Sequence, residues 1–66
     1  MGGNLKNFRL SIGFTQEQMA ERIGFSRPYY NAIELGLKPG SMRFWQTIEK
    51  QFNLSESKVW GLTKLK

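Results

Sequence analysis

Apolar residues recur at helical spacing along the chain, in four amphipathic stretches and a shorter fifth. Apolar side chains three or four positions apart share one face of an α-helix, and no alternation typical of a strand persists beyond a few residues. The pattern predicts an all-α fold of five short helices, at about residues 5–12, 16–23, 27–35, 42–52 and 56–62. The apolar stripes are, in chain order, Leu5, Phe8 and Ile12; Met19, Ala20 and Ile23; Tyr30 and Ile33; and Met42, Trp45, Ile48 and Phe52, and these we expect to face inward. The fifth stretch carries Val59, Trp60 and Leu62, with Leu65 beyond.

Residues that typically begin and end helices stand at the boundaries of these stretches. Thr15 and Gln18 have the spacing of a capping box. Pro28 falls in a first turn, where its missing N–H costs little. The connections are short and we find no repeat, so we expect residues 1–66 to form one domain. The candidate N-caps are Thr15, Ser26, Ser41 and Ser55, and the candidate left-handed C-terminal residues are Gly13, Gly24, Gly36 and Asn53.

Composition narrows the range of functions. The 66 residues include ten Lys and Arg against five acidic residues, a net charge of +5 with a pI near 10.0. Such an excess of positive charge on a small surface favours polyanions, nucleic acid first and anionic membranes second. The sequence contains no His, Cys or Asp, which excludes a Ser–His–Asp triad, a disulfide and a thiolate or imidazole metal site. We therefore expect no enzymatic activity, no metal and no cofactor.

The sequence gives no indication of a membrane protein. No apolar run approaches the roughly 20 residues of a membrane span, and no secretory signal pattern is found. A basic helix that lies on a membrane surface would gather its cations on one face, whereas here they are spread through all the helices. We expect a cytoplasmic protein that does not bind membranes.

The pattern at residues 16–35 has the form of a helix-turn-helix. Two helical stretches, 16–23 and 27–35, are separated by three residues that begin with Gly24. A short glycine turn sets two helices at a steep angle, which lets the second helix project into the major groove of DNA. Ala20 supplies the small side chain that such a helix crossing requires.

These residues resemble the Cro- and phage-repressor-like (XRE) helix-turn-helix proteins. The resemblance covers roughly residues 5–62 and implies a compact five-helix, lambda-repressor-like domain that binds double-stranded DNA. The matching segments are Leu5-x-x-Phe8-Arg9, Gly13-Phe14-Thr15-Gln16, Ala20-x-x-Ile23-Gly24-Phe25-Ser26-Arg27, Ile33-Glu34-x-Gly36, Pro39-x-Ser41 and Asn53-Leu54-Ser55.

The resemblance also implies roles for individual residues. Arg9 and Glu34 match an internal ion pair between the first and third helices. The family reads bases with the exposed face of its third helix and grips the phosphate backbone around it. The implied base-reading positions are Arg27, Pro28, Asn31 and Ala32, and the implied phosphate contacts are Gln16, Ser26, Tyr29, Lys38 and Arg43.

Some of these roles have structural alternatives. Arg27, if it reads a base, prefers the O6 and N7 atoms of guanine, while Asn31 is balanced between base contact and solvent exposure. Tyr29 is balanced between a phosphate contact and packing beside the second helix. Tyr30 stands where the family has a branched aliphatic core residue, so we expect a buried ring with its hydroxyl at the edge of the core.

Two departures from the family pattern affect local details. Glu49 stands where the family often has alanine, which predicts unusual packing in the fourth helix. Pro28 removes a hydrogen-bond donor from the recognition face, which shifts the weight of readout to Arg27, Asn31 and DNA shape.

One recognition helix covers only a few base pairs, so we expect a homodimer, weak in the absence of DNA, on a pseudo-palindromic operator. The fifth helix carries more apolar residues than a small core should hide. An alternative is that Trp60 folds back onto Phe52. The predicted dimer surface consists of Leu54, Val59, Trp60, Leu62 and Leu65.

The function that we expect is transcriptional regulation, most simply repression by blocking polymerase, with any signal sensed by a partner protein. Within the same family, an antitoxin or a restriction–modification controller stays open. From another class, a protein-interaction module could have kept the scaffold and lost DNA binding. Gln16, Arg27, Lys38 and Arg43 argue against that last alternative.

Overall fold

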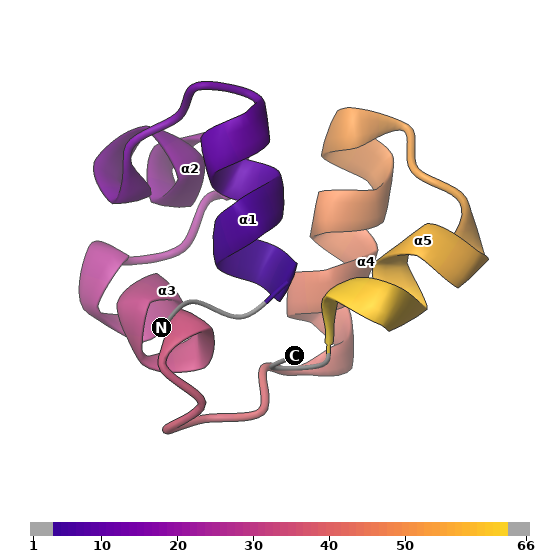
Figure 1. Cartoon of the computed structure of the whole chain (residues 1–66). Coiled ribbons are helices and arrows are strands. Elements are labelled where there is room, and N and C mark those ends of the chain that lie inside the picture. Colours follow the sequence, from indigo (N-terminus) through magenta and orange to yellow (C-terminus); the bar gives the residue numbers. More distant parts are fainter. Residues whose placement is uncertain (1–3, 64–66) are drawn as a thin grey trace.

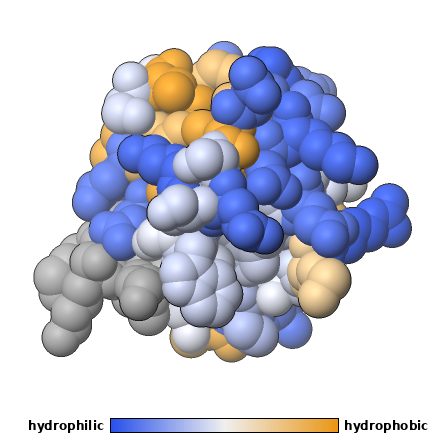
Figure 2. Space-filling model, turned by 90° about the vertical axis from the view of Figure 1, so that its right-hand side faces the viewer, coloured by the Kyte–Doolittle hydropathy of each residue, from blue (hydrophilic) through white to orange (hydrophobic). Residues whose placement is uncertain are grey.

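A computed structural model describes residues 4–63, which form five α-helices and no strand. Figure 1 shows α2 and α3 on one side of α1, and α4 and α5 on the other. The α4–α5 side, turned toward the viewer in Figure 2, is largely hydrophilic with pale and orange areas between the blue ones. The all-α prediction is confirmed, and every predicted helix end lies within one residue of the observed one. The helices are Asn4–Ser11 (α1), Gln16–Ile23 (α2), Arg27–Glu34 (α3), Met42–Phe52 (α4) and Glu56–Leu62 (α5).

The helix caps explain why these boundaries could be predicted. Thr15 and Gln18 form a complete capping box, in which the Thr15 hydroxyl accepts from the Gln18 N–H at 3.1 Å and the Gln18 side chain accepts from the Thr15 N–H at 2.9 Å. The hydroxyl groups of Ser26, Ser41 and Ser55 each accept a backbone N–H of the first turn that follows. These bonds satisfy donors that a helix cannot pair internally.

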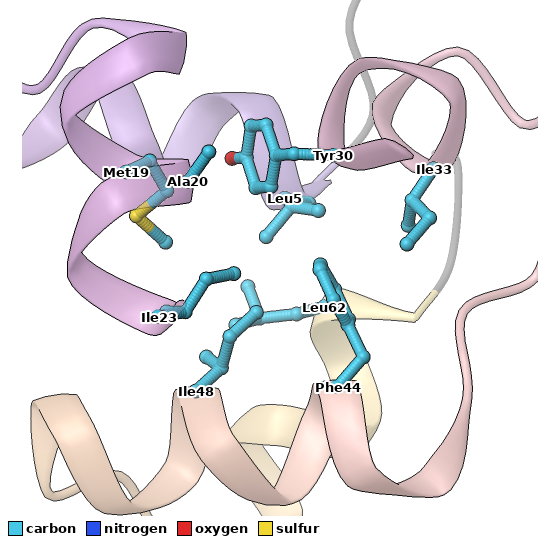
Figure 3. Packing of buried hydrophobic residues seen from close by; sticks show 9 residues of the cluster. All are labelled: Leu5, Met19, Ala20, Ile23, Tyr30, Ile33, Phe44, Ile48 and Leu62. Atoms are coloured by element: carbon cyan, nitrogen blue, oxygen red, sulfur yellow. The ribbon is translucent and has the colours of Figure 1, made fainter. Parts of the chain in front are cut away.

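The core lies where α1, α2, α3 and α4 meet, with α5 closing one end (Figure 3). Tyr30, Phe44, Met19 and Ile48 are its largest fully buried side chains. Half-buried aromatic residues extend it outward. Its nine buried members are Leu5, Met19, Ala20, Ile23, Tyr30, Ile33, Phe44, Ile48 and Leu62, and the residues packed against them are Phe8, Phe14, Phe25, Tyr29, Trp45, Phe52 and Leu54.

The predicted inward face of α4 was partly wrong. Phe44, which is not among the expected inward positions, is fully buried, whereas Met42 is 76% exposed. Successive residues turn by about 100° around a helix, so Phe44, Trp45, Ile48 and Phe52 share one face and Met42 lies outside it. In α1, Ile12 lies beyond the end of the helix and is exposed.

The prediction that the Tyr30 hydroxyl lies at the edge of the core was also wrong. The whole residue is buried, and its hydroxyl oxygen makes no hydrogen bond to any group in the described part of the chain. Burial raises the pKa of Tyr30 well above its ordinary value, so the hydroxyl stays protonated. An aliphatic side chain, which has no hydroxyl, would leave no such unpaired polar group at this position.

The predicted dimer surface needs a larger correction. Val59 and Leu62 are buried in the protomer, because α5 packs against both α1 and α4 and turns these two residues inward. Leu54 is half-buried against the core, and Leu65 lies outside the described residues. Of the five residues assigned to the surface, Trp60 is exposed, at 69%. It does not fold back onto Phe52, whose ring packs edge-on against two phenylalanines of α1 and the α1–α2 loop.

A buried ion pair joins α1 to α3. Arg9 Nε donates to Glu34 Oε2 at 2.7 Å, and the two side chains are 8% and 3% exposed. Arg9 Nη1 also donates to the carbonyl of Phe14 at 2.8 Å, in the loop between α1 and α2. Two buried charges are tolerated only when each keeps its partner and its hydrogen bonds. The pair therefore fixes α3 against both α1 and the approach to α2.

We expect Glu34→Ala to lower the free energy of unfolding by about 3–5 kcal/mol, because it leaves the Arg9 guanidinium buried without a counter-charge. The control is Glu21→Ala, which removes the same charge from an exposed position in α2 and should change stability by about 0.5 kcal/mol or less. Urea unfolding followed by tryptophan fluorescence measures both. Equal effects of the two substitutions would contradict a structural role for the pair.

The same pair predicts a pH dependence. Burial alone raises the pKa of Glu34, but hydrogen bonds from Arg9 and Gln16 outweigh it, so the pKa is lower than in the unfolded chain. The stabilisation is therefore present at neutral pH and is lost as the pH falls through the folded-state pKa. We expect the stability advantage of wild type over Glu34→Gln to shrink below about pH 4. An advantage that is constant from neutral to acidic pH would contradict this account.

Candidate nucleic-acid interface

The turn between α2 and α3 sets the angle of the two helices. Gly24 ends α2 with a left-handed backbone, at φ 77°. Residues other than glycine rarely adopt this conformation. The Phe25 N–H then donates to the Ala20 carbonyl at 3.0 Å, and Ser26 caps α3. Ala20 is 2% exposed, as expected for the small residue where two helices cross. The local sequence thus forms a tight helix-turn-helix.

The head of α3 is free of the core. Arg27 and Pro28 are exposed, and Asn31 and Ala32 are half-buried on the same helix. Tyr30, Ile33 and Glu34 occupy the opposite, buried face. The four residues proposed to read bases therefore lie on the accessible side of a helix that is anchored from behind.

The side chain of Gln16 is engaged inside the protein. Its Nε2 donates to Asn31 Oδ1 at 2.7 Å and to Glu34 Oε1 at 3.0 Å, which uses both hydrogens of the amide. A phosphate oxygen only accepts hydrogen bonds, so this arrangement leaves Gln16 no side-chain donor for it. The backbone N–H of Gln16, at the first position of α2, has no acceptor within its own helix. A phosphate contact of Gln16 stays a prediction, and this N–H is the donor that could make it.

For Tyr29 the structure favours packing over phosphate contact. Its ring stacks on Phe25 with centroids 5.6 Å apart, and meets the edge of Phe44 at 5.9 Å. Aromatic pairs of this geometry stabilise a fold beyond the area that they bury. Tyr29 thus supports the turn from outside the core. A contact between its hydroxyl and DNA stays a prediction.

The remaining cations predicted to bind phosphate follow α3. Lys38 and Arg43 are exposed, in the α3–α4 loop and in the first turn of α4. Several bonds hold the loop: the Leu37 and Lys38 N–H groups both donate to the Ala32 carbonyl, at 2.8 and 3.3 Å, and Trp45 Nε1 donates to the Pro39 carbonyl at 3.1 Å. Lys38 is therefore carried by an ordered loop beside the end of the recognition helix.

A shallow hollow brings several of these groups together. It is lined by the end of α1, the start of α2 and the head of α3, and both Gln16 and Arg27 stand at it. Glu17 is the acidic residue in this lining. Backbone N–H groups at the start of α2 and the Arg27 guanidinium are donors suited to an anion. The structure gives no contact that joins Lys38 or Arg43 to this hollow.

Sequence reasoning missed two features of the site. The first is the extension of the predicted Arg9–Glu34 ion pair, which the structure contains, through Gln16 to Asn31. Glu34 and Asn31 are three residues apart in one helix, so a shared partner was foreseeable from spacing, but the identity of Gln16 as that partner depends on the helix crossing. The second is Trp45, whose indole N–H anchors the loop that carries Lys38.

Neither a metal site nor a membrane-spanning helix is found among the described residues. Residues 4–63 contain no group of three or more metal-ligating side chains. None of the helices in that range is long and apolar enough to cross a membrane.

Comparison with known proteins agrees with this geometry. A helix-turn-helix family model matches residues 5–59. The propionyl-CoA carboxylase regulator of Cereibacter sphaeroides is 33% identical over 58 residues, which are 88% of this chain and 13% of that protein. The chain thus spans about an eighth of the length of this relative. No solved structure matches the chain. With a family match over most of its length and two capped helices crossing at a glycine turn, the chain belongs to the XRE-type helix-turn-helix family.

Proposed function

We propose that this protein binds duplex DNA sequence-specifically, as a dimer on a pseudo-palindromic operator, and represses transcription there. The observation that carries the proposal is the exposed head of α3, held from behind by the buried ion pair and the Gln16 amide. A reading helix must be rigid for its side chains to discriminate between base edges. Family membership and the similarity to a regulator support DNA binding and transcriptional regulation.

Charge supports the same function. The net charge of +5 gives an attraction to phosphate that is independent of sequence. Arg27 lies in the first turn of α3, and Lys38 and Arg43 follow that helix in the chain. The proposed base contact and the proposed phosphate contacts are therefore grouped around α3. Phosphate contacts position a protein on DNA, whereas base contacts give its specificity.

The exposed apolar surface on α4 and α5 supports the dimer. Met42 is 76% and Trp60 is 69% exposed, and both line a groove between these helices together with Trp45 and Val59. We assign this groove to a second copy of the chain, because a single recognition helix reads too few base pairs for an operator. Pairing of this kind would set the two α3 helices about 34 Å apart, one turn of B-DNA. An interface centred on one tryptophan is small, which predicts a weak dimer in the absence of DNA.

Selection from a random duplex library, followed by anisotropy titration of the winning sequence, tests the proposed function. We expect one enriched motif with two related half-sites, and an affinity that falls steeply as salt rises, because bound cations release counter-ions from phosphates. Equal affinity for every duplex, even at low salt, would contradict specific regulation.

Two substitutions separate base reading from phosphate grip. Arg27→Ala should lower discrimination at one base position by about 1–3 kcal/mol, because it removes a bidentate contact to guanine. Lys38→Ala should weaken binding to all sequences alike and reduce the salt slope by roughly one unit. Lys50→Ala, which removes the same charge from an exposed position on α4, is the control. If Arg27→Ala leaves every base preference unchanged, Arg27 is not a reader.

The dimer surface is tested by sedimentation of wild type and Trp60→Ala, each with and without operator duplex. We expect wild type to bind as two copies on one operator and Trp60→Ala to lose this cooperative pairing while its single-site binding persists. Ile12→Ala serves as the control, since Ile12 is exposed and lines neither this groove nor the hollow at Arg27. Normal dimerisation of Trp60→Ala on DNA would show that the groove is not the interface.

A further inference from the structure

The buried ion pair extends through Gln16 to a residue on the reading face. Arg9 donates to Glu34, Gln16 Nε2 donates to Glu34 Oε1 at 3.0 Å, and the same nitrogen donates to Asn31 Oδ1 at 2.7 Å. The series thus runs from a fully charged group in the core to a neutral amide on α3. We call these four residues the Arg9–Asn31 network.

The chemistry of the network fixes which atom each amide presents. The pKa of Glu34 is lowered, with burial opposed by its hydrogen bonds, so the group is an ionised carboxylate that only accepts. Gln16 must therefore turn its nitrogen, not its oxygen, toward Glu34. That nitrogen in turn requires an acceptor from Asn31, which turns Asn31 Oδ1 inward. Asn31 Nδ2 then faces away from Gln16, and within residues 4–63 it donates to no other group.

We infer that the Arg9–Asn31 network makes Asn31 a donor-only reader, which selects a G·C base pair instead of the adenine that asparagine otherwise prefers. This inference rests on the proposed function of the α3 face. An unconstrained asparagine pairs with adenine through both its oxygen and its nitrogen. Here Asn31 Oδ1 is turned inward onto the Gln16 amide, so the group that Asn31 can present to the groove is Nδ2 with its two N–H donors.

Guanine and adenine present different groups to a pair of N–H donors in the major groove. Guanine presents two adjacent acceptors, N7 and O6, in the major groove, whereas adenine places an amino donor beside its N7. Two donors facing guanine meet two acceptors, while the same donors facing adenine meet one acceptor and one opposing donor. Gln16 is a positioning residue in this scheme, since it sets the polarity of Asn31 without a base contact of its own.

The test is motif selection from the random duplex library with wild type, Asn31→Ala and Gln16→Met. Asn31→Ala identifies the position that Asn31 reads, because the preference there is lost. At that position we expect wild type to select G·C. Gln16→Met keeps the side-chain length and helix propensity but has no amide donor, so Asn31 is released and the preference should move to A·T. The position read by Arg27 should stay unchanged in Gln16→Met.

A second measurement uses the wild-type protein alone. Replacing the guanine at this position of the selected duplex with 7-deazaguanine removes the N7 acceptor, and we expect a loss of affinity of roughly tenfold. The same replacement at a guanine outside the motif is the control. This experiment holds even if Gln16→Met does not fold.

The outcomes separate this inference from the function on which it rests. If no duplex is enriched, the proposed function itself fails. If a motif is enriched but wild type selects A·T at the Asn31 position, or Gln16→Met keeps G·C, the donor-only inference is overturned and sequence-specific binding stands. A motif that Asn31→Ala leaves unchanged at every position overturns the inference in the same way.

Discussion

Two opposite charges buried between the first and third helices constrain the rest of this domain. Neither Arg9 nor Glu34 can turn away to another partner without leaving its counterpart desolvated, which costs several kcal/mol. The guanidinium also binds the Phe14 carbonyl, and the carboxylate also binds the Gln16 amide. In a domain whose total stability is about 5–15 kcal/mol, one pair thus fixes α1, α3 and the start of α2 together.

The consequence for function is that the recognition helix is supported from behind and free in front. Apolar packing alone, through Tyr30 and Ile33, holds α3 on the core but is non-directional. Hydrogen bonds to Glu34 add direction, because their geometry tolerates little rotation of the helix. The proposed reading of DNA depends on that restriction, since base edges are discriminated by the position of single donor and acceptor atoms.

Much of the fold could be predicted from the sequence because helix ends are determined locally. Thr15 and Gln18 are three residues apart, and their capping box forms whatever lies elsewhere. The burial of a side chain is different, because it depends on which other helices pack against it in the folded domain. The periodicity of α4 is compatible with either Met42 or Phe44 on the apolar face, and packing against the α2–α3 turn and α3 decides for Phe44. Likewise Val59 is buried because α5 docks on α1 and α4, which no local pattern shows.

The surface that we propose to bind DNA is the α2–α3 face, positioned by the buried pair. The most direct measurement is an NMR titration of the ¹⁵N-labelled protein with its selected duplex, compared at matched concentrations with a scrambled one. Under this assignment, we expect the largest amide shifts at the starts of α2 and α3 and around Lys38, and we expect them with the selected duplex. Shifts confined to the α4–α5 face around Trp60, or equal shifts with both duplexes, would contradict it.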